Sequence, residues 1–382
     1  MGKTALMLVF IQILRAVAAT MVVWHHARHE AGLLAARGAG AALAPGTLLP
    51  WWAGVDLFFV ISGLVIVLAS RSLAGAPGGR GRFLAHRIAR VVPLYWLTTT
   101  LYLALALAAP GLLGEAGALG RDPAFVAASF LFWPMARPDG SLQPLYGLGW
   151  TLNYEMAFYA LFALGLGFGL RGAVAWLGGV LVALVALGTL VSPPPPLAFW
   201  ADPIVLEFAL GAGLGLARLA GLRLPSGARI ALALLGLAGM LGAAWHLGGE
   251  GEVPGFARPL LVGLPAGLLV AAAAFGPGLG RGRIAALPAP LRALAVLGDA
   301  SYALYLTHPF ALRAGREALL RLGLAPALHP WVAMAAMTGL ALLAALAVHR
   351  LVERPLTRSS RGFLENRVGP SRRPVFIGRE DR

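Results

Sequence analysis

The sequence predicts an all-α fold, a polytopic membrane helix bundle with about ten transmembrane helices. Three observations predict this class. Of the 382 residues, 59% are hydrophobic and only 12% are charged, which is the composition of a polytopic membrane protein. Apolar runs long enough to cross a bilayer recur along the chain. The arginines gather in the short segments between these runs, as they do in membrane proteins. One membrane domain is expected at 1–357, followed by a tail at 358–382.

Ten apolar runs have the length of a transmembrane helix, about 17 to 25 residues. The first could pass for a signal peptide, but Arg15 interrupts it and it continues to Trp24, so we interpret it as an uncleaved span. A further apolar segment, 124–136, is too short to cross and is expected to be re-entrant or interfacial. The expected spans are 8–27, 51–70, 91–109, 154–170, 173–192, 204–221, 228–247, 259–277, 294–312 and 331–350.

The distribution of charge predicts which side of the membrane each loop faces. The net charge is +15, and every basic residue except Lys3 is an arginine. Most arginines between the spans, and those after His349, fall on one side, which the positive-inside rule assigns to the cytoplasm. Both termini are therefore expected to be cytoplasmic, in an inner (plasma) membrane. Three arginines contradict the rule because they fall on the external side, namely Arg313, Arg316 and Arg321.

Several classes of protein are disfavoured by the same composition. The arginine excess indicates contact with anionic lipid and not with nucleic acid, because it lies in loops at a membrane surface. The chain has no cysteine, and His25 and His26 would point about 100° apart on a helix, so no metal site is expected. No phosphate-loop, zinc-hydrolase or nucleophile-elbow motif is present. The tail at 358–382 lacks apolar periodicity and is expected to be disordered and cytoplasmic.

Two ionisable residues share one face of the first span. Arg15 and His26 are eleven residues apart, close to three helical turns, so their side chains would lie on one stripe about 16 Å apart along the axis. Ionisable residues inside a bilayer normally face a bundle interior or a watery cavity. Alternatively, Arg15 snorkels to the cytoplasmic surface while His26 lies in the opposite headgroup layer.

Four carboxylates also lie within or at the edge of apolar spans, where a charge is costly. Each of them could pair with an arginine near the end of a span, or take part directly in chemistry. Together with Arg15 and His26 they indicate a polar cavity inside the bundle, which favours an enzyme or a transporter over a passive scaffold. The four are Asp56, Glu155, Glu207 and Asp299.

Other polar residues suggest how such a cavity is built. Arg87 and Arg90 are three residues apart and therefore neighbours on one helical face, where two guanidinium groups suit the phosphate of a nucleotide-like donor or of a lipid headgroup. Glu155 lies near the level expected for His26, whose tautomer a carboxylate can fix. Ser62 precedes Gly63 in a pattern typical of close helix packing. His308 precedes Pro309 and is either a polar group at the outer mouth or a hydrogen-bonded histidine at a helix end.

Seven stretches, in this order, carry a resemblance that covers about residues 9 to 357. The chain resembles the integral-membrane acyltransferase family 3, whose members O-acylate bacterial surface polysaccharides, lipopolysaccharide antigens, nodulation oligosaccharides and some macrolides. The matching pieces are Leu14-Arg-Ala with His26; Gly54-Val-Asp-Leu-Phe-Phe-Val-Ile-Ser-Gly63; Arg87-Ile-Ala-Arg-Val-Val-Pro-Leu-Tyr95; Trp150-Thr-Leu with Glu155; Glu207-Phe with Gly211; Gly298-Asp-Ala-Ser-Tyr with Tyr305-Leu and His308; and Glu353-Arg-Pro355.

The resemblance implies a ten-helix acyltransferase that moves an acyl group, expected to be acetyl, from cytoplasmic acyl-coenzyme A to a hydroxyl of a glycan or related acceptor. Arg15 and His26 match the arginine-to-histidine motif of the family. Arg87 and Arg90 match its basic pair, and Glu155 matches its acid in the fourth span. The chain departs from the family at Gln12 and Asp202, where an acid and a basic residue, respectively, are common. The esterase-like domain that some members append is not found.

We therefore expect His26 to be the base or a transient acyl carrier, Glu155 to orient it, and Arg15, Arg87 and Arg90 to hold phosphates or the developing charge. Acyl-coenzyme A would be a co-substrate, and no bound cofactor or metal is expected. The expected partners are this donor, a hydroxyl-bearing acceptor and membrane lipids, without nucleic acid. A transporter or flippase that uses the same charges as a proton relay or glycan path is the alternative. The expected supporting polar residues are Asp56, Ser62, Glu207, Asp299 and His308.

Overall fold

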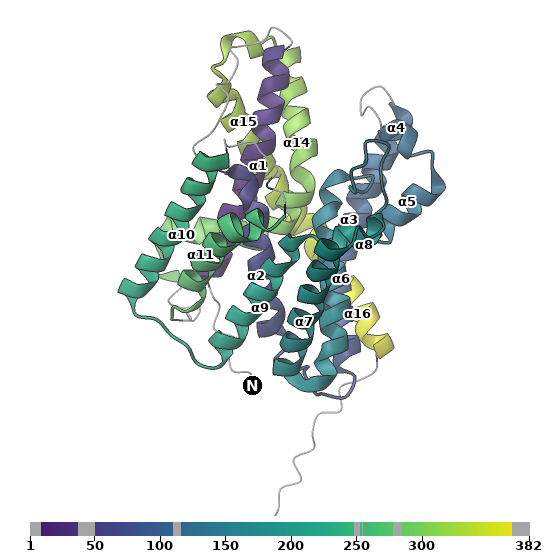
Figure 1. The fold of residues 1–382 in the computed structure, drawn as a ribbon. Helices are drawn as coiled ribbons and strands as arrows, with labels where there is room; N and C mark the ends of the chain where they lie inside the picture. The colour runs from purple at the N-terminus through teal and green to yellow at the C-terminus, as the bar shows by residue number, and fades with distance from the viewer. Residues whose placement is uncertain are drawn as a thin grey trace, which may run out of the picture.

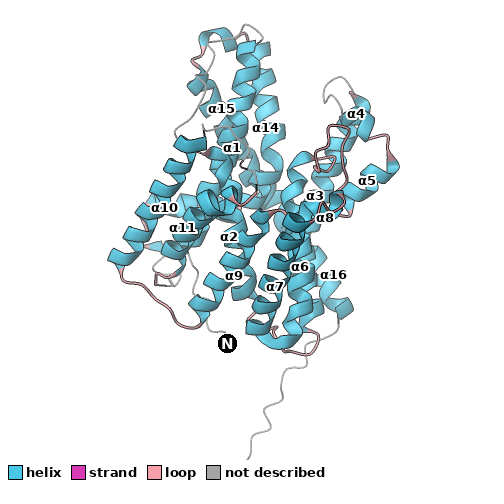
Figure 2. Cartoon of the chain, in the orientation of Figure 1, coloured by secondary structure: helices cyan, strands magenta, loops and turns pink. Residues whose placement is uncertain are grey.

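The computed structural model describes residues 9–36, 50–109, 116–247, 253, 255–277 and 285–368. Within these residues every regular element is a helix and there is no strand (Figures 1 and 2). The predicted all-α class is therefore confirmed. Lys3 and residues 369–382 of the expected tail lie outside the described residues.

Ten helices form the main body of the bundle, and each overlaps one of the expected apolar spans. They are α1 (Val9–Ala36), α2 (Gly54–Ala69), α3 (Gly79–Ala108), α6 (Trp150–Gly165), α7 (Gly169–Leu190), α9 (Leu206–Leu219), α10 (Ser226–Leu247), α11 (Leu264–Ala274), α14 (Ser301–Arg321) and α15 (Pro330–Val348).

Shorter elements connect or extend these helices. The short α-helices are α4 (Ala116–Leu119), α5 (Pro123–Phe130), α8 (Pro195–Trp200), α13 (Ala289–Asp299) and α16 (Arg354–Val368). The single-turn elements are η1 (Trp51–Ala53), η3 (Gly147–Gly149), η4 (Leu166–Phe168), η5 (Pro203–Val205), η6 (Pro259–Gly263), η7 (Ala325–Ala327) and η8 (His349–Glu353).

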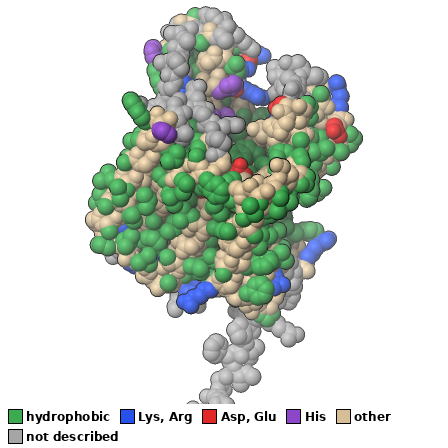
Figure 3. All heavy atoms as spheres, in the orientation of Figure 1, with side chains coloured by type: hydrophobic (Ala, Val, Ile, Leu, Met, Phe, Trp, Pro, Cys, Tyr) green, Lys and Arg blue, Asp and Glu red, His purple; other side chains and the backbone are tan. Residues whose placement is uncertain are grey.

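Six helical stretches in the described part of the chain are long and apolar enough to cross a membrane by length and composition. These stretches make the chain a multi-pass membrane protein, while the count of ten spans stays a prediction. Figure 3 fits this assignment, because hydrophobic side chains cover the middle of the visible face and charged side chains gather toward its two ends. Such an apolar belt is what a bilayer requires.

The ninth expected span, 294–312, differs from the structure. The helical structure is interrupted at Ala300, between α13 and α14, and α14 then continues to Arg321. The hydropathy pattern predicts one continuous span because the residues on both sides of this interruption are apolar. Gly298, at the end of α13, lies against the backbone of Gln12 in α1, where a side chain would collide. This close approach packs the end of α13 against α1.

Helices α2 and α9 pack most closely at the centre of the bundle. A side-chain carbon on Gly63 would collide with the backbone of α9 at Phe208, and one on Gly211 would collide with the backbone of α2 at Val60. Small residues permit such close contact in membrane helices. The packing interpretation of Ser62-Gly63 is therefore confirmed.

Helices α1, α14 and α15 run side by side and extend beyond the rest of the bundle, whereas α3, α6, α7 and α16 group on the other side (Figure 1). Helix α16 occupies residues that we expected to begin a disordered tail. It packs on α3, and Glu365 accepts both His86 Nε2 at 2.6 Å and Arg361 Nε at 2.7 Å. These polar contacts order residues 358–368, although they lack the apolar periodicity used to recognise spans.

The helix of the segment 124–136 is α5, which has only eight residues and is too short to cross a bilayer, as expected. This helix begins at Pro123 and is capped by Asp122, whose carboxylate accepts the backbone N–H groups of Ala124 and Phe125 at 2.9 and 3.2 Å. This side-chain cap satisfies two of the backbone donors that the start of a helix leaves unpaired.

Candidate active site

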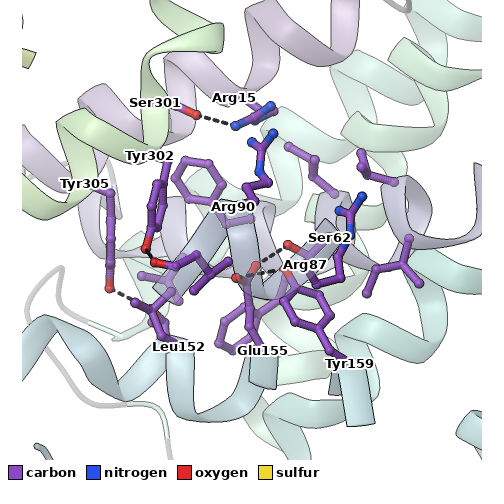
Figure 4. A pocket seen from close by; sticks show the side chains of 18 residues that line it. Arg15, Ser62, Arg87, Arg90, Leu152, Glu155, Tyr159, Ser301, Tyr302 and Tyr305 are labelled. Carbon is purple, nitrogen blue, oxygen red and sulfur yellow. Dashed lines mark hydrogen bonds between the residues drawn. The ribbon is translucent and has the colours of Figure 1, made fainter. Parts of the chain in front are cut away.

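A cavity with about 800 Å³ of empty space, part of it open to the surroundings, lies between α1, α2, α3, α6 and α14 (Figure 4). Its walls are mostly apolar and aromatic, and α2 supplies the largest share of them. Four charged side chains enter this apolar space: Arg15, Arg87, Arg90 and Glu155. The structure therefore brings together charged residues from three helices that the sequence singled out separately.

Arg15 is held at the edge of the cavity by two neutral groups. Its Nη1 donates to Gln12 Oε1 at 3.2 Å, and its Nη2 donates to Ser301 Oγ at 2.8 Å. Gln12 stands where many members of the resembled family have an acid, so here the local partner of the guanidinium carries no charge. The positive charge of Arg15 is consequently not cancelled by these two contacts.

Arg87 and Arg90 point from one face of α3 into the cavity (Figure 4). The expected third span begins at residue 91 and leaves both arginines outside it, at the membrane surface, but α3 begins at Gly79 and both residues lie well inside the helix. The guanidinium of Arg87 also lies 5.8 Å from the centre of the Phe83 ring. Because both side chains line an internal cavity, a bound anion in this cavity explains them better than a lipid headgroup at the surface.

Glu155 supplies the negative charge of the cavity. Its Oε1 accepts a hydrogen bond from Ser62 Oγ at 2.7 Å, and its Oε2 accepts one from Tyr159 at 3.1 Å (Figure 4). Ser62 therefore has a second use besides helix packing. The structure does not show the expected contact between Glu155 and His26. The carboxylate of Glu155 instead accepts hydrogen bonds from side chains of α2 and α6, at the level of the arginines.

His26 does not line the cavity, and the rings of His308 and Tyr305 lie between it and the cavity. Its ring packs against the ring of His308, with the ring centres 5.1 Å apart. The His308 ring is in turn 6.3 Å from the ring of Tyr305, which lines the cavity. Since α1 is continuous over both residues, Arg15 and His26 are about 16 Å apart along its axis, as expected.

Three further predicted residues lie outside the cavity. Asp56 is fully buried and forms a forked ion pair with Arg258, at 2.9 and 3.2 Å. Glu207 is also buried, and its carboxylate oxygens have no hydrogen-bond partner in the described part of the chain. It lies beside the Asp56–Arg258 pair, whose charges act on it. Asp299, at the end of α13, is half-buried and acts electrostatically on Arg15.

The lining side chains carry three positive charges and one negative charge, so two positive charges are uncompensated among them. An ionised group in an apolar surrounding is costly unless it is paired. Such a lining suits a negatively charged ligand. No group of three or more histidine, aspartate or glutamate side chains that could hold a metal ion occurs among the described residues.

Sequence reasoning missed several residues of this site. Ser301 and Tyr305 fall in stretches that carried the family resemblance, but nothing in the pattern showed that their hydroxyls face Arg15 and the cavity. Tyr159 follows Glu155 by one helical turn, and that spacing was a usable signal. Arg258 was missed as the partner of Asp56 because the two are 202 residues apart.

The fold and the site define a multi-pass helical membrane protein with a basic cavity inside its bundle. A family model described as an acyltransferase domain matches residues 8–350, and the chain belongs to this family, the integral-membrane acyltransferase family 3. Over 317 residues the chain is 35% identical to "Exopolysaccharide production protein ExoZ" of Rhizobium meliloti (strain 1021), a match that covers 81% of this chain and 90% of that protein. No solved structure matches the chain. The protein is accordingly a membrane acyltransferase, a transferase of groups other than amino-acyl groups.

Proposed function

We propose that the protein transfers an acyl group, acetyl in the first instance, from acyl-coenzyme A to a hydroxyl of a surface glycan. The observation that supports acyl-coenzyme A as the donor is the cavity, which has three arginines and one carboxylate in an otherwise apolar wall. Guanidinium groups bind phosphate through paired, charge-assisted hydrogen bonds. The phosphates at one end of such a donor would bind the arginines, and the uncharged acyl arm at its other end would lie against the apolar wall.

The acceptor is inferred from the relative. The printed name of that protein assigns it to exopolysaccharide production, and a glycan offers the hydroxyl that O-acylation needs. We place the protein in the inner membrane with both termini in the cytoplasm, on the distribution of its arginines. The phosphate end of the donor would then enter from the cytoplasmic side, where α3 begins.

The proposed reaction uses His26 as the base. The acceptor hydroxyl oxygen attacks the thioester carbon while His26 takes the hydroxyl proton. The carbon–sulfur bond then breaks, and the departing sulfur takes the proton back, so that no net charge is produced. Because His308 and Tyr305 lie between His26 and the cavity, the thioester must reach past the Tyr305 wall of the cavity to meet His26. Glu155, with Ser62 and Tyr159, would shape the donor end.

The donor assignment is tested by Arg87→Ala, with Arg80→Ala as the matched control. Both are arginines of α3, but Arg87 lines the cavity and Arg80 is exposed. The loss of one charge-assisted contact of about 1.5–3 kcal/mol should raise the donor KM roughly 10- to 100-fold with little change in kcat. The Arg80 variant should keep the KM of the unaltered protein. A pure loss of kcat at unchanged donor affinity in Arg87→Ala contradicts the phosphate role.

Labelled acyl-coenzyme A separates this function from transport. Vesicles that contain the purified protein should move the label covalently onto the glycan. Passage of the unmodified glycan across the vesicle membrane, without covalent label, would instead support the transporter or flippase alternative.

A further inference from the structure

We propose that His308 is a positioning residue for His26: its ring selects the tautomer in which His26 can act as a base. This inference rests on the proposed function, in which His26 takes the hydroxyl proton. Two observations carry it, namely the hydrogen bond that fixes the ring of His308 and the separation of the two imidazole rings.

The hydrogen bond of His308 determines which of its nitrogens carries hydrogen. The side chain is fully buried, and its Nδ1 lies 3.0 Å from the carbonyl oxygen of Leu304. A carbonyl oxygen only accepts hydrogen bonds, so Nδ1 must be the donor. A second proton would leave a buried, unpaired charge, which is costly. His308 is therefore neutral, and Nε2 carries a lone pair.

That lone pair accepts no hydrogen bond from the described residues. His308 Nε2 is buried and has no hydrogen-bond partner among the described residues. A buried acceptor without a partner costs free energy, so an unpaired one in a native protein calls for a donor. The ring of His26 is the aromatic group that packs against His308 from the neighbouring helix, at 5.1 Å between centres and with 38° between the ring planes.

The separation of the rings fits a hydrogen bond between the two imidazoles. A hydrogen bond of about 2.9 Å from nitrogen to nitrogen, joining two five-membered rings edge to edge, places the ring centres about 5 Å apart. This hydrogen bond requires the His26 ring to turn so that one of its nitrogens faces His308 Nε2. Glu155 does not orient His26 in the observed arrangement, because its carboxylate accepts hydrogen bonds from Ser62 and Tyr159.

The consequence is a relay of three groups on two helices. The carbonyl of Leu304 holds His308, and His308 Nε2 accepts the N–H of one His26 nitrogen. A neutral imidazole with hydrogen on one nitrogen has its lone pair on the other. That second nitrogen of His26 takes the proton of the acceptor hydroxyl and returns it to the departing sulfur. His308 touches neither reactant, so its effect passes entirely through His26.

Two amide substitutions test the role, because they differ only in reach. In His308→Gln the amide oxygen takes the place of Nε2 and can still accept, whereas in His308→Asn the amide ends at the place of Nδ1. The assay uses purified protein in vesicles with labelled acetyl-coenzyme A as donor and the exopolysaccharide fraction of cells lacking the gene as acceptor. We expect kcat to fall on the order of 100-fold in His308→Asn and less than about 10-fold in His308→Gln, with an unchanged donor KM in both.

Equal losses in the two amide variants, or a change confined to KM, would overturn the inference, because a merely structural histidine would be replaced equally badly by either amide. His308→Leu, which is apolar and has no acceptor, replaces the asparagine variant if that chain does not accumulate, and should show the same loss of kcat. The proposed function fails separately, when the unaltered protein transfers no label or His26→Ala transfers it normally.

Discussion

At the scale of single residues, Arg15 shows how the cavity keeps its positive charge. Its partners are the amide of Gln12 and the hydroxyl of Ser301, and both are neutral. The contact with Gln12 follows from a spacing of three residues on one helix, which sequence alone can predict. The contact with Ser301 spans 286 residues and depends on the packing of α1 against α14, so only the structure reveals it.

Ser301→Ala removes the hydroxyl that holds Arg15 and should weaken donor binding. A hydrogen bond to a charged group contributes about 1.5–3 kcal/mol, so we expect the donor KM to rise roughly 10-fold or more. Thr307→Ala is the matched control on α14, since its hydroxyl donates only to Ala303 in its own helix. Steady-state kinetics with varied acyl-coenzyme A measure both. An unchanged KM in Ser301→Ala would show that Arg15 does not need this contact.

The Asp56–Arg258 pair should be a structural ion pair and not part of the chemistry. Removing one partner of a buried pair leaves an uncompensated charge and costs about 3–5 kcal/mol. We therefore expect Asp56→Ala and Arg258→Ala each to lower the thermal stability of the detergent-purified protein. The double variant should lose less stability than the sum of the two single losses. Strictly additive losses would argue that the two side chains do not interact.

At the scale of elements, the hydropathy pattern predicts which segments are helices but not how they meet. Every expected span overlaps a helix, because about 20 apolar residues leave few alternatives in a bilayer. The break at Ala300 and the order of α16 were not predicted, since each depends on contacts with α1 or α3. The place of Glu155 was mispredicted for the same reason: its level relative to His26 depends on how α6 lies against α2.

Two glycines of α9 give a direct test of the contact between α2 and α9. Gly211 lies against the backbone of α2 at Val60, whereas a side chain on Gly213 meets nothing within 4 Å. Gly211→Ala should therefore destabilise the protein by about 1–3 kcal/mol through overpacking. Gly213→Ala should leave stability unchanged or raise it slightly, because alanine favours a helix. Thermal unfolding compares the two, and similar melting temperatures would contradict the packing described for these helices.

At the scale of the whole molecule, two of the three arginines that contradict the positive-inside rule pair with one acid of α1. Arg316 Nη1 donates to Glu30 Oε2 at 2.6 Å, and Arg313 Nε lies 3.7 Å from the other oxygen of the same carboxylate. The sequence could not show this pairing, because Glu30 is at the far end of α1, 286 residues from Arg316.

The absence of cysteine from the chain makes the proposed orientation simple to test. Ser72→Cys, between α2 and α3, and Ala136→Cys, after α5, place single thiols in exposed positions. With a cytoplasmic N-terminus, a membrane-impermeant maleimide should label position 136 in intact cells and position 72 only after the membrane is opened. The reverse pattern would place the donor cavity on the opposite side and would contradict the proposed topology.

The most direct test of the central claim compares the unaltered protein with His26→Ala at equal abundance in cells that lack the gene, and measures acyl groups on the surface glycan by mass spectrometry. If His26 is the base for transfer to a glycan hydroxyl, the unaltered protein restores the acylated glycan. The His26 variant then lowers acyl transfer by at least about 100-fold while its donor binding stays intact. Acylation by His26→Ala at the level of the unaltered protein would contradict the account.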